Sequence, residues 1–392
     1  MIILLLKERF KNCRSISGRG FTAASKKAWI VLDDGTACVG QAFGYQKNVI
    51  GEVVFTTGMV GYTKSLTDPS YKGQILMFTY PLIGNYGVPS YLDVDEFGLP
   101  RFFESDTIKV QGVIVHEYCA KPSHWASTQN IHEWLLREEI PGICGVDTRS
   151  LTQRIRVKGV MMGAIVIGEA PEKGFMMLEK AKKYGEINFV DEVSIKSPKI
   201  YGSGKEIIAL IDYGVKLNIL RSLLLRGFKV VRLPYDYSID QILSFNPDGI
   251  VLSNGPGDPK QLTSSVIVVK ELLDKYNKPI LGICLGNQVL SLAGGADTYK
   301  LKFGHRGQNK PALELANGKC YIVSENHGYA VDGKSLEKSE FDVWLKNIDD
   351  GTIEGLKHRT KPILSTQFHP EASPGPYDTT FVFDVFAEMV RS

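Results

Sequence analysis

Short apolar runs alternate with helix-like stretches in the second half of the chain, and this alternation constrains the fold more than any other feature. Runs typical of buried strands occupy residues 207–211, 228–233, 249–253 and 279–284. Each is followed by a stretch with helical periodicity, at residues 216–226, 238–245, 263–276 and 286–293. Such a repeat predicts an α/β domain over residues 206–392, with a mostly parallel sheet and helices on both faces.

The first half of the chain has a different pattern. An apolar run at 29–32 is followed by Asp34-Gly35 and a second run, which predicts a β-hairpin. Further strands are expected at 52–55, 75–79, 110–115 and 163–167, and helices at 130–139, 148–158 and 170–184. Residues 28–193 are therefore expected to form a β-rich, mixed α/β domain. The polar segment 194–205, which contains Pro198 and two glycines, is predicted to be the interdomain linker.

The first 27 residues form a basic extension, in which seven lysines and arginines stand against the single acid Glu8. The apolar run at 1–6 is too short for the core of a secretory signal. We expect a disordered extension or a misassigned start; an organellar transit peptide is the alternative. The six cysteines are scattered and show no C-x-x-C spacing, which favours reduced thiols and a cytoplasmic location.

The composition excludes a wholly disordered chain, a coiled coil and a collagen-like fibre. Hydrophobic residues make up 43% of the chain and charged residues 23%, which are ordinary values for a globular protein. The formal net charge of +3 gives no argument for a nucleic-acid partner. No apolar run approaches the roughly 18 residues that a membrane-spanning helix needs. Neither nucleic acid nor membrane is therefore expected as a partner.

The sharpest chemical signal is the segment Gly282-Ile283-Cys284-Leu285-Gly286, which ends an apolar run and opens a helix. Glycines two residues before and after Cys284 permit a sharp strand-to-helix turn, on which the thiol stands clear of the backbone. The adjacent helix N-terminus stabilises a thiolate. The segment therefore indicates a nucleophile; the alternative is a buried cysteine at a tight turn.

A second signal, His369-Pro370-Glu371, follows the apolar run 363–366. Residues two apart on an extended chain point to the same side, with Cα atoms about 6.6 Å apart. Glu371 can therefore orient the His369 ring and stabilise its charged form. Alone, such a pair is usually an ordinary surface hydrogen bond, but with Cys284 it supplies the nucleophile, base and orienting group of acyl transfer.

Two weaker segments complete the set. The loop 253–259 exposes backbone N–H groups after a strand, and one of them could form an oxyanion hole with the N–H of Leu285. An ordinary turn is the alternative, and the loop lacks the ending of a P-loop. His327, within 325–329, could compete with His369 as the base. No carboxylate follows it two residues later, so substrate contact or packing is the preferred interpretation.

Together these segments resemble the class I, triad-type glutamine amidotransferases from about residue 204 to the C-terminus. Further segments resemble the small subunit of carbamoyl-phosphate synthetases, and they lie at 51–57, 66–71, 79–85, 145–149, 212–221 and 369–376. The resemblance extends over nearly the whole chain from Ala28 onward. It implies a flavodoxin-like sheet in the second domain.

The resemblance also implies a reaction and a site. Glutamine would be hydrolysed to glutamate and ammonia through a thioester on Cys284, with His369 as the base and Glu371 as its orienting group. Glutamine would be held by residues that match the family's binding positions: Ser70, Gly255, Gly257, Leu285, Gln288, Asn326, Gly328 and Tyr329. Because Ser70 belongs to the first domain, the glutamine site is expected between the domains. No metal site and no cofactor are implied for this chain.

The implied partner is a separate large subunit. It would receive the ammonia and use ATP and Mg²⁺ to make carbamoyl phosphate from bicarbonate, for arginine or pyrimidine synthesis or both. Two positions depart from the usual pattern of the family. Asn287 replaces a histidine, which leaves Cys284 and the triad intact but puts the tuning of the glutaminase rate in doubt, and Tyr329 replaces a phenylalanine.

Three other functions stay open from the sequence. The chain could be the glutaminase of another synthetase, such as anthranilate synthase, although the domain before residue 195 argues against this. A non-catalytic regulatory subunit is a second alternative, which loss of the nucleophile would have favoured. A cysteine hydrolase of a different amide is the third, and it would make the match in the first domain a coincidence.

Overall fold

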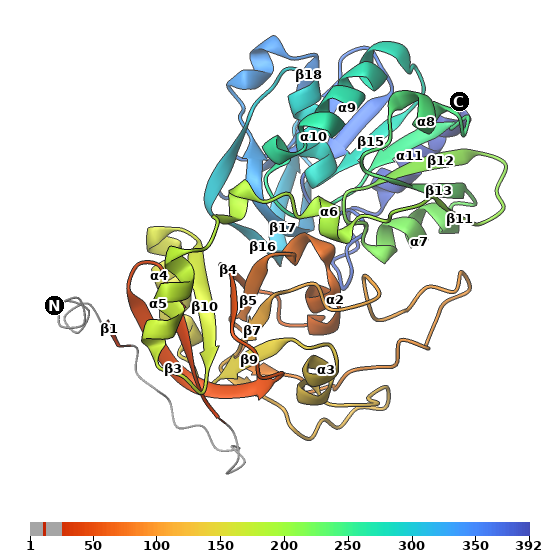
Figure 1. Cartoon of the computed structure of the whole chain (residues 1–392). Coiled ribbons are helices and arrows are strands. Elements are labelled where there is room, and N and C mark those ends of the chain that lie inside the picture. Colours follow the sequence, from red (N-terminus) through yellow and green to blue (C-terminus); the bar gives the residue numbers. More distant parts are fainter. Residues whose placement is uncertain (1–10, 13–25) are drawn as a thin grey trace. The chain divides into compact units, whose positions relative to one another are not determined.

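The structure is a computed structural model that describes residues 11–12 and 26–392, and these residues fall into two compact units (Figure 1). Residues up to Asp93 and Asp106–Tyr184 form the first unit, and Val94–Ser105 with Gly185–Ser392 form the second. Most of the predicted basic extension, residues 1–27, lies outside the described part of the chain. Within that part, every helix is too short or too polar to cross a membrane.

The first unit is built on an eight-stranded sheet in the order β1-β3-β2-β10-β4-β5-β7-β9. Strand β9 also pairs with β3, so seven of these strands close into a ring. The bounds are β1 Lys11–Asn12, β2 Lys27–Leu32, β3 Thr36–Gly44, β4 Val49–Thr56, β5 Gln74–Phe78, β7 Gly112–Ile114, β9 Pro141–Cys144 and β10 Met161–Ile167, with a separate pair β6 Leu82–Ile83 and β8 Glu117–Tyr118. The predicted hairpin, β2 and β3, is confirmed.

The helices of the first unit are short, and three of them lie where the sequence predicts helices, whereas α2 and η1 were not predicted. They are α2 Tyr62–Thr67, η1 Pro69–Tyr71, α3 Ile131–Arg137, α4 Thr148–Lys158 and α5 Pro171–Glu179. Helix α4 has its predicted bounds: the side chain of Asp147 accepts a hydrogen bond from the Ser150 N–H, and Gly159 ends the helix.

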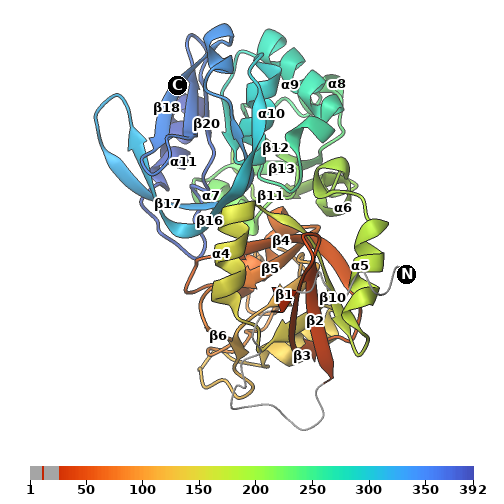
Figure 2. The same cartoon turned by 90° about the vertical axis from the view of Figure 1, so that its left-hand side faces the viewer.

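Helix α5 ends five residues before its predicted end. Its apolar side chains Phe175 and Leu178 pack against β2 and β10, which Figure 2 shows beside it. The following residues 180–183 are three lysines and an alanine, which cannot extend this apolar face.

The second unit contains a ten-stranded sheet in the order β11-β13-β12-β14-β15-β20-β19-β18-β16-β17. Its parallel part consists of β12 Ile207–Asp212, β13 Lys229–Pro234, β14 Gly249–Leu252, β15 Ile280–Ile283 and β20 Ile363–Thr366. Numbered along the chain, these five strands lie in the order 2-1-3-4-5, which is the flavodoxin-like arrangement. The predicted fold class is confirmed.

An antiparallel extension continues this sheet beyond β20. It consists of β16 Thr298–Glu314, β17 Cys320–Val331, β18 Phe341–Asn347 and β19 Ile353–His358. The sequence indicated only that residues 325–329 lie in a β-rich stretch. The extension brings that stretch onto the same sheet as the parallel strands.

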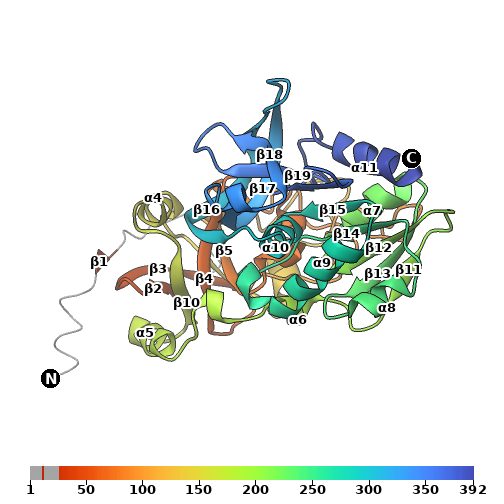
Figure 3. The same ribbon diagram turned by 90° about the horizontal axis from the view of Figure 1, so that it is seen from above.

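Helices cover both faces of the parallel strands, as Figure 3 shows from above. Alternate strand residues divide between two cores. Ala209 and Ile211 of β12 belong to one core, with side chains of α8, α9 and α10, and Ile208 and Leu210 belong to the other, with α7 and α11. The remaining helical segments are η2 Tyr184–Glu186, α6 Val190–Val193, α7 Leu217–Leu225, α8 Ile239–Leu243, η3 Pro259–Gln261, α9 Thr263–Lys275, α10 Leu285–Ala293, η4 Ser335–Lys338 and α11 Phe381–Arg391.

The segment predicted as a linker, 194–205, differs from that interpretation. The two units divide at Tyr184 and Gly185, and residues 194–205 lie within the second unit. Strand β11, Lys199–Tyr201, pairs antiparallel with β13 at the edge of the sheet. A strand of three residues is too short to show a periodic pattern, so it could not be distinguished from a loop in the sequence.

Asp212, the last residue of β12, organises the loop that leads into α7. Its carboxylate accepts hydrogen bonds from the N–H groups of Gly214 and Val215, at 2.9 and 2.8 Å. It also pairs with Arg232 at 2.7 Å, and its side chain is fully buried. The loop 213–216 is therefore fixed by a buried charge rather than by side-chain packing alone.

We expect Asp212→Ala to lower the free energy of unfolding by about 3–5 kcal/mol, because it leaves the largely buried Arg232 without its carboxylate. Asp384→Ala is the matched control. Asp384 pairs with Arg226 at 2.7 Å, but its side chain is 59% exposed, so a loss of about 0–1 kcal/mol is expected. Denaturant unfolding of the two variants measures the difference, and equal losses would contradict the role given to Asp212.

Candidate active site

Cys284 lies at the turn between β15 and α10, in a backbone conformation that residues other than glycine rarely adopt. Its φ is 54° and its ψ is −103°. The two flanking glycines are needed for close approach: a Cβ on Gly286 would lie 2.1 Å from the carbonyl oxygen of Leu252, and one on Gly282 would lie 3.0 Å from the backbone of Gly286. This is the strained strand–turn–helix geometry that presents a nucleophile.

Two contacts connect this turn to other strands of the sheet. The backbone N–H of Cys284 donates to the carbonyl oxygen of Thr366 at 2.8 Å, where β20 ends. The Sγ atom lies 3.7 Å from the carbonyl oxygen of Asn326 on β17. The turn therefore contacts the end of β20, and the thiol lies next to the segment 325–329.

His369 and Glu371 follow β20 and are both buried. The Nδ1 atom of His369 lies 2.7 Å from Oε1 of Glu371. The backbone N–H of His369 donates to the carbonyl oxygen of Ser324 at 2.9 Å. Burial alone would lower the pKa of His369, but the Glu371 carboxylate and the Cys284 thiol raise it above its ordinary value. The imidazole is thus set between a carboxylate and the thiol.

Lys216 is a member of this site that the sequence analysis did not identify. Its Nζ lies 2.9 Å from Oε1 of Glu371 and donates to the carbonyl of Ala372 at 2.8 Å. Burial would raise the pKa of Glu371, but the charges of Lys216 and His369 lower it to about 2. The available signal was a lysine in the segment 212–216, directly after a strand, yet nothing local indicates that its charge is buried.

The loop 253–259 and Leu285, which were predicted to supply the N–H groups of an oxyanion hole, are neighbours in the structure. Strands β14 and β15 are adjacent, so the loop after β14 lies beside the Cys284 turn. A Cβ on Gly255 would lie 2.2 Å from the Tyr213 carbonyl and 2.8 Å from the Leu285 side chain. Leu285 is the first residue of α10, and an N–H at this position has no acceptor within its helix. Gly257, with φ of 92°, follows in the same loop.

Gln288 and Asn287 connect α10 to the neighbouring strands. The Gln288 amide donates to the Tyr329 carbonyl at 2.8 Å and to Oε1 of Gln367 at 3.1 Å. Asn287 donates to the same Gln367 oxygen at 3.2 Å and accepts from the Ser365 hydroxyl at 2.7 Å. The residue that departs from the family pattern therefore fixes Gln367, two residues before His369, through a buried and uncharged amide.

The other predicted glutamine contacts lie in two places. Asn326, Gly328 and Tyr329 are all on β17 of the second unit. Ser70 belongs to the first unit, in the short helix η1, where its N–H donates to Oδ1 of Asp68 at 2.9 Å. Its participation in glutamine binding stays a prediction.

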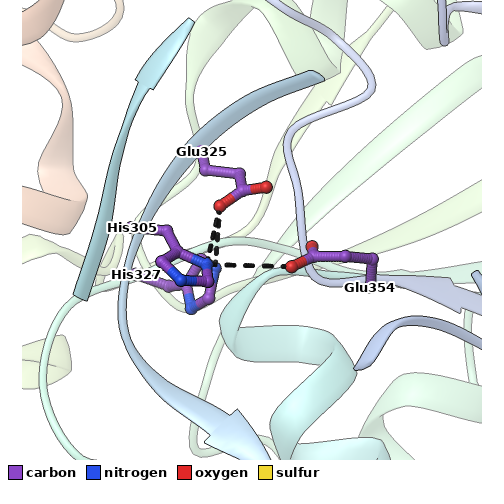
Figure 4. Close-up of side chains that lie close together, drawn as sticks. All are labelled: His305, Glu325, His327 and Glu354. Carbon is purple, nitrogen blue, oxygen red and sulfur yellow. Dashed lines mark ion pairs between the residues drawn. The ribbon is translucent and has the colours of Figure 1, made fainter. Parts of the chain in front are cut away.

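His327 points into a second buried cluster, with Glu325, His305 and Glu354 (Figure 4). No carboxylate follows His327 two residues later, but Glu325 precedes it by two residues, with Oε2 3.4 Å from His327 Nε2. Burial lowers the pKa of His327, and burial with the nearby Glu325 charge raises that of Glu354 to about 8. Of His327 and His369, the latter is the one whose pKa the Cys284 thiol raises.

Two family models match this chain, one in its first half and one in its second half. Residues 30–165 match the family model described as "Carbamoyl-phosphate synthase small chain, CPSase domain", and residues 209–389 match "Glutamine amidotransferase class-I". The chain is 49% identical over 371 residues to the carbamoyl phosphate synthase small chain of Pyrococcus furiosus, covering 93% of this chain and 98% of that one.

Two further relatives agree. The carbamoyl phosphate synthase small chain of Sulfolobus acidocaldarius is 48% identical, over 92% of this chain and 96% of that one. The arginine-specific small chain of Chaetomium globosum is 47% identical, over 94% of this chain and 79% of that one. With full-length relatives at this identity and both units matched, the chain belongs to the carbamoyl phosphate synthase small-chain family, an enzyme subunit of the glutaminase type.

Proposed function

We propose that this chain hydrolyses glutamine on Cys284 and passes the ammonia to a carbamoyl phosphate synthase large subunit. The observation that carries the proposal is a cysteine on a strained strand-to-helix turn whose thiol raises the pKa of a buried histidine, with that histidine 2.7 Å from a carboxylate. This arrangement supplies a nucleophile, a proton acceptor and an orienting group in one unit.

In the first half of the reaction the Cys284 thiolate attacks the side-chain amide carbon of glutamine. The carbonyl oxygen becomes an oxyanion, which the N–H groups of Gly255 and Leu285 would stabilise. The C–N bond then breaks, and the leaving nitrogen takes a proton from the His369 imidazolium and departs as ammonia. A glutamyl thioester on Cys284 remains.

In the second half a water molecule gives a proton to His369 and attacks the thioester carbon. The C–S bond breaks, the thiolate is restored and glutamate leaves. Glu371 stabilises the charged imidazole in both halves, and Lys216 keeps Glu371 ionised despite its burial. The charge state of the site therefore returns to its starting point after each turnover.

Glutamine would be held by residues of both units. The contacts within the second unit would come from Gln288, Asn326, Gly328 and Tyr329, and from Gly257 in the loop 253–259. Ser70 would contribute from the first unit. The large subunit would use ATP and Mg²⁺ to make carbamoyl phosphate from bicarbonate and the ammonia. That product would supply arginine synthesis, pyrimidine synthesis or both.

We expect Cys284→Ala to abolish glutamine-dependent carbamoyl phosphate synthesis by the complex of the two subunits, because no thioester can form. His369→Ala should reduce it by roughly 10²–10⁴-fold, the usual contribution of a general base. Synthesis from added ammonium salt should persist in both variants. Cys320→Ala, at an exposed thiol, is the control and should keep both activities.

The two assays separate the alternatives. Full glutamine-dependent activity in Cys284→Ala would refute the nucleophile and favour a regulatory subunit. Equal loss of the ammonia-dependent activity would refute the division of labour between the two subunits.

For Lys216→Met we expect the acidic limb of the kcat/KM profile for glutamine to move to higher pH. The Lys216 charge lowers the pKa of Glu371, so its removal raises that pKa, and activity is then lost at a higher pH as the solution is acidified. A shift of about 1–3 pH units is expected for an adjacent opposite charge. Lys196→Met, at an exposed ion pair with Asp191, is the control; an unmoved limb in Lys216→Met would contradict the assignment.

Ser70→Ala should raise the KM for glutamine about two- to twelvefold, the effect of losing one neutral hydrogen bond of roughly 0.5–1.5 kcal/mol. The ammonia-dependent activity and the melting temperature should stay unchanged. Ser65→Ala, at a partly buried serine in the preceding helix α2, is the control. An unchanged KM would place the glutamine site wholly within the second unit.

A further inference from the structure

Four buried side chains form a cluster that takes no part in the proposed reaction. His305 comes from β16, Glu325 and His327 from β17, and Glu354 from β19. One nitrogen or oxygen atom of each lies within 4.8 Å of those of the other three. Figure 4 shows the two carboxylates and the two imidazoles facing one another. Such a convergence of imidazole and carboxylate groups is typical of a metal site.

The antiparallel extension brings these residues together. His305 and His327 lie opposite each other in the β16–β17 ladder, and Glu325 is on the same side of β17 as His327. The ladder shifts its register on both sides of His305–Gly307, and such irregularities redirect side chains. Strand β18 joins β16 to β19, which carries Glu354. The cluster is thus held by three strands of one sheet, β16, β17 and β19.

Each imidazole has one nitrogen committed to another partner. His327 Nδ1 lies 2.8 Å from the carbonyl oxygen of Tyr329, which can only accept, so this nitrogen carries the proton. His305 Nε2 lies 2.8 Å from Oδ2 of Asp350, a carboxylate acceptor. The other nitrogens, His327 Nε2 and His305 Nδ1, are left facing the cluster. Metal-binding histidines are oriented in this way, with the second ring nitrogen donating to a carbonyl or a carboxylate.

The carboxylates are oriented in the same manner. Oε1 of Glu325 and Oε1 of Glu354 each lie 3.4 Å from the amide nitrogen of Asn347, and Thr352 donates to Glu354 Oε1 at 3.2 Å. These donors are neutral, so they do not compensate the charges. Glu354 Oε2 is buried without a hydrogen-bond partner among the described residues. Glu325 Oε2, His305 Nδ1 and His327 Nε2 have only one another, with Glu325 Oε2 2.9 Å from His305 Nδ1 and 3.4 Å from His327 Nε2. A divalent cation among the four side chains would take the two inward imidazole nitrogens and an oxygen of each carboxylate as ligands, and its charge would favour the ionised form of both carboxyl groups.

We propose that His305, Glu325, His327 and Glu354 bind a divalent transition-metal ion, for which Zn²⁺ is the best match. In a tetrahedral zinc site with bonds of about 2.0–2.2 Å, neighbouring ligand atoms lie about 3.3–3.6 Å apart. Here Glu325 Oε2 is 2.9 Å from His305 Nδ1 and 3.4 Å from His327 Nε2, and Glu354 Oε1 is 3.8 Å from His305 Nδ1. Imidazole ligands favour zinc over magnesium or calcium.

The metal would fix the strand that carries three predicted glutamine contacts. His327 lies between Asn326 and Gly328, and the Tyr329 carbonyl accepts from both His327 and Gln288. The four ligands are therefore positioning residues, because they act on glutamine through β17. Zinc binding itself does not depend on the proposed function, whereas this effect on glutamine binding rests on it.

The test is zinc binding by the full-length chain, stripped with a chelator and titrated with Zn²⁺ against a colorimetric chelator. The Cys284→Ala background excludes binding at the nucleophile. We expect one zinc per chain. Cobalt substitution should give the visible absorption of a tetrahedral site without a thiolate charge-transfer band, because no cysteine is among the ligands.

Variants identify the ligands. Glu354→Gln removes a ligand, and Asp350→Asn removes the carboxylate that orients His305 and should weaken zinc binding about 10–100-fold. Because the Asp350 side chain is 41% exposed and Asn keeps an oxygen for Thr352, this second variant tests the site even if Glu354→Gln fails to fold. Asp349→Asn is the matched control; its carboxylate pairs with Lys310 at the surface, and zinc affinity should not change.

Zinc affinity equal in the parent, Glu354→Gln and Asp350→Asn would overturn the site and leave a network in which the four side chains share protons. If zinc binds, its removal from the complex with Cys284 intact should raise the KM for glutamine and leave ammonia-dependent synthesis unchanged. An unchanged KM would overturn the positioning role. Absence of glutaminase activity in the zinc-loaded complex with Cys284 intact would refute the proposed function instead.

Discussion

The Glu371 carboxylate is fully buried and still ionised because Lys216 and His369 both contact it. Removing either cation would leave a buried charge uncompensated, so the three residues depend on one another. Lys216 is delivered by the loop that Asp212 holds at the end of β12, and His369 by the end of β20. The carboxyl ends of parallel strands meet at one edge of a sheet, and this edge also carries Cys284 at the end of β15.

Strand β17 connects the nucleophile to the second cluster. The Asn326 carbonyl contacts Cys284, whereas Glu325 and His327 point into the cluster of two histidines and two glutamates. Because side chains alternate along a strand, the Asn326 side chain lies on the face opposite to theirs. A change that displaces β17 would therefore affect both places at once, even though they share no side chain.

The features predicted from the sequence are those encoded locally. The alternation of strands and helices, the Asp147 cap of α4 and the glycines around Cys284 each depend on a few neighbouring residues. Lys216, His305 and Glu354 escaped prediction because their partners are far away in the chain or lie across a ladder with irregular register. Strand β11 escaped because three residues carry too little pattern, and hydrogen bonds to β13 decide their structure.

The order 2-1-3-4-5 of the parallel strands has a consequence for biosynthesis. Strand β15, which ends at the nucleophile, pairs with β20, and the four strands of the antiparallel extension are synthesised between them. A chain still emerging from the ribosome can form β15 and α10, on either side of Cys284, before the segment carrying its base exists. Pairings this distant in the chain form late in folding. The thiol of a nascent chain thus stays without its proton acceptor until β20 and the segment 367–371 have been synthesised.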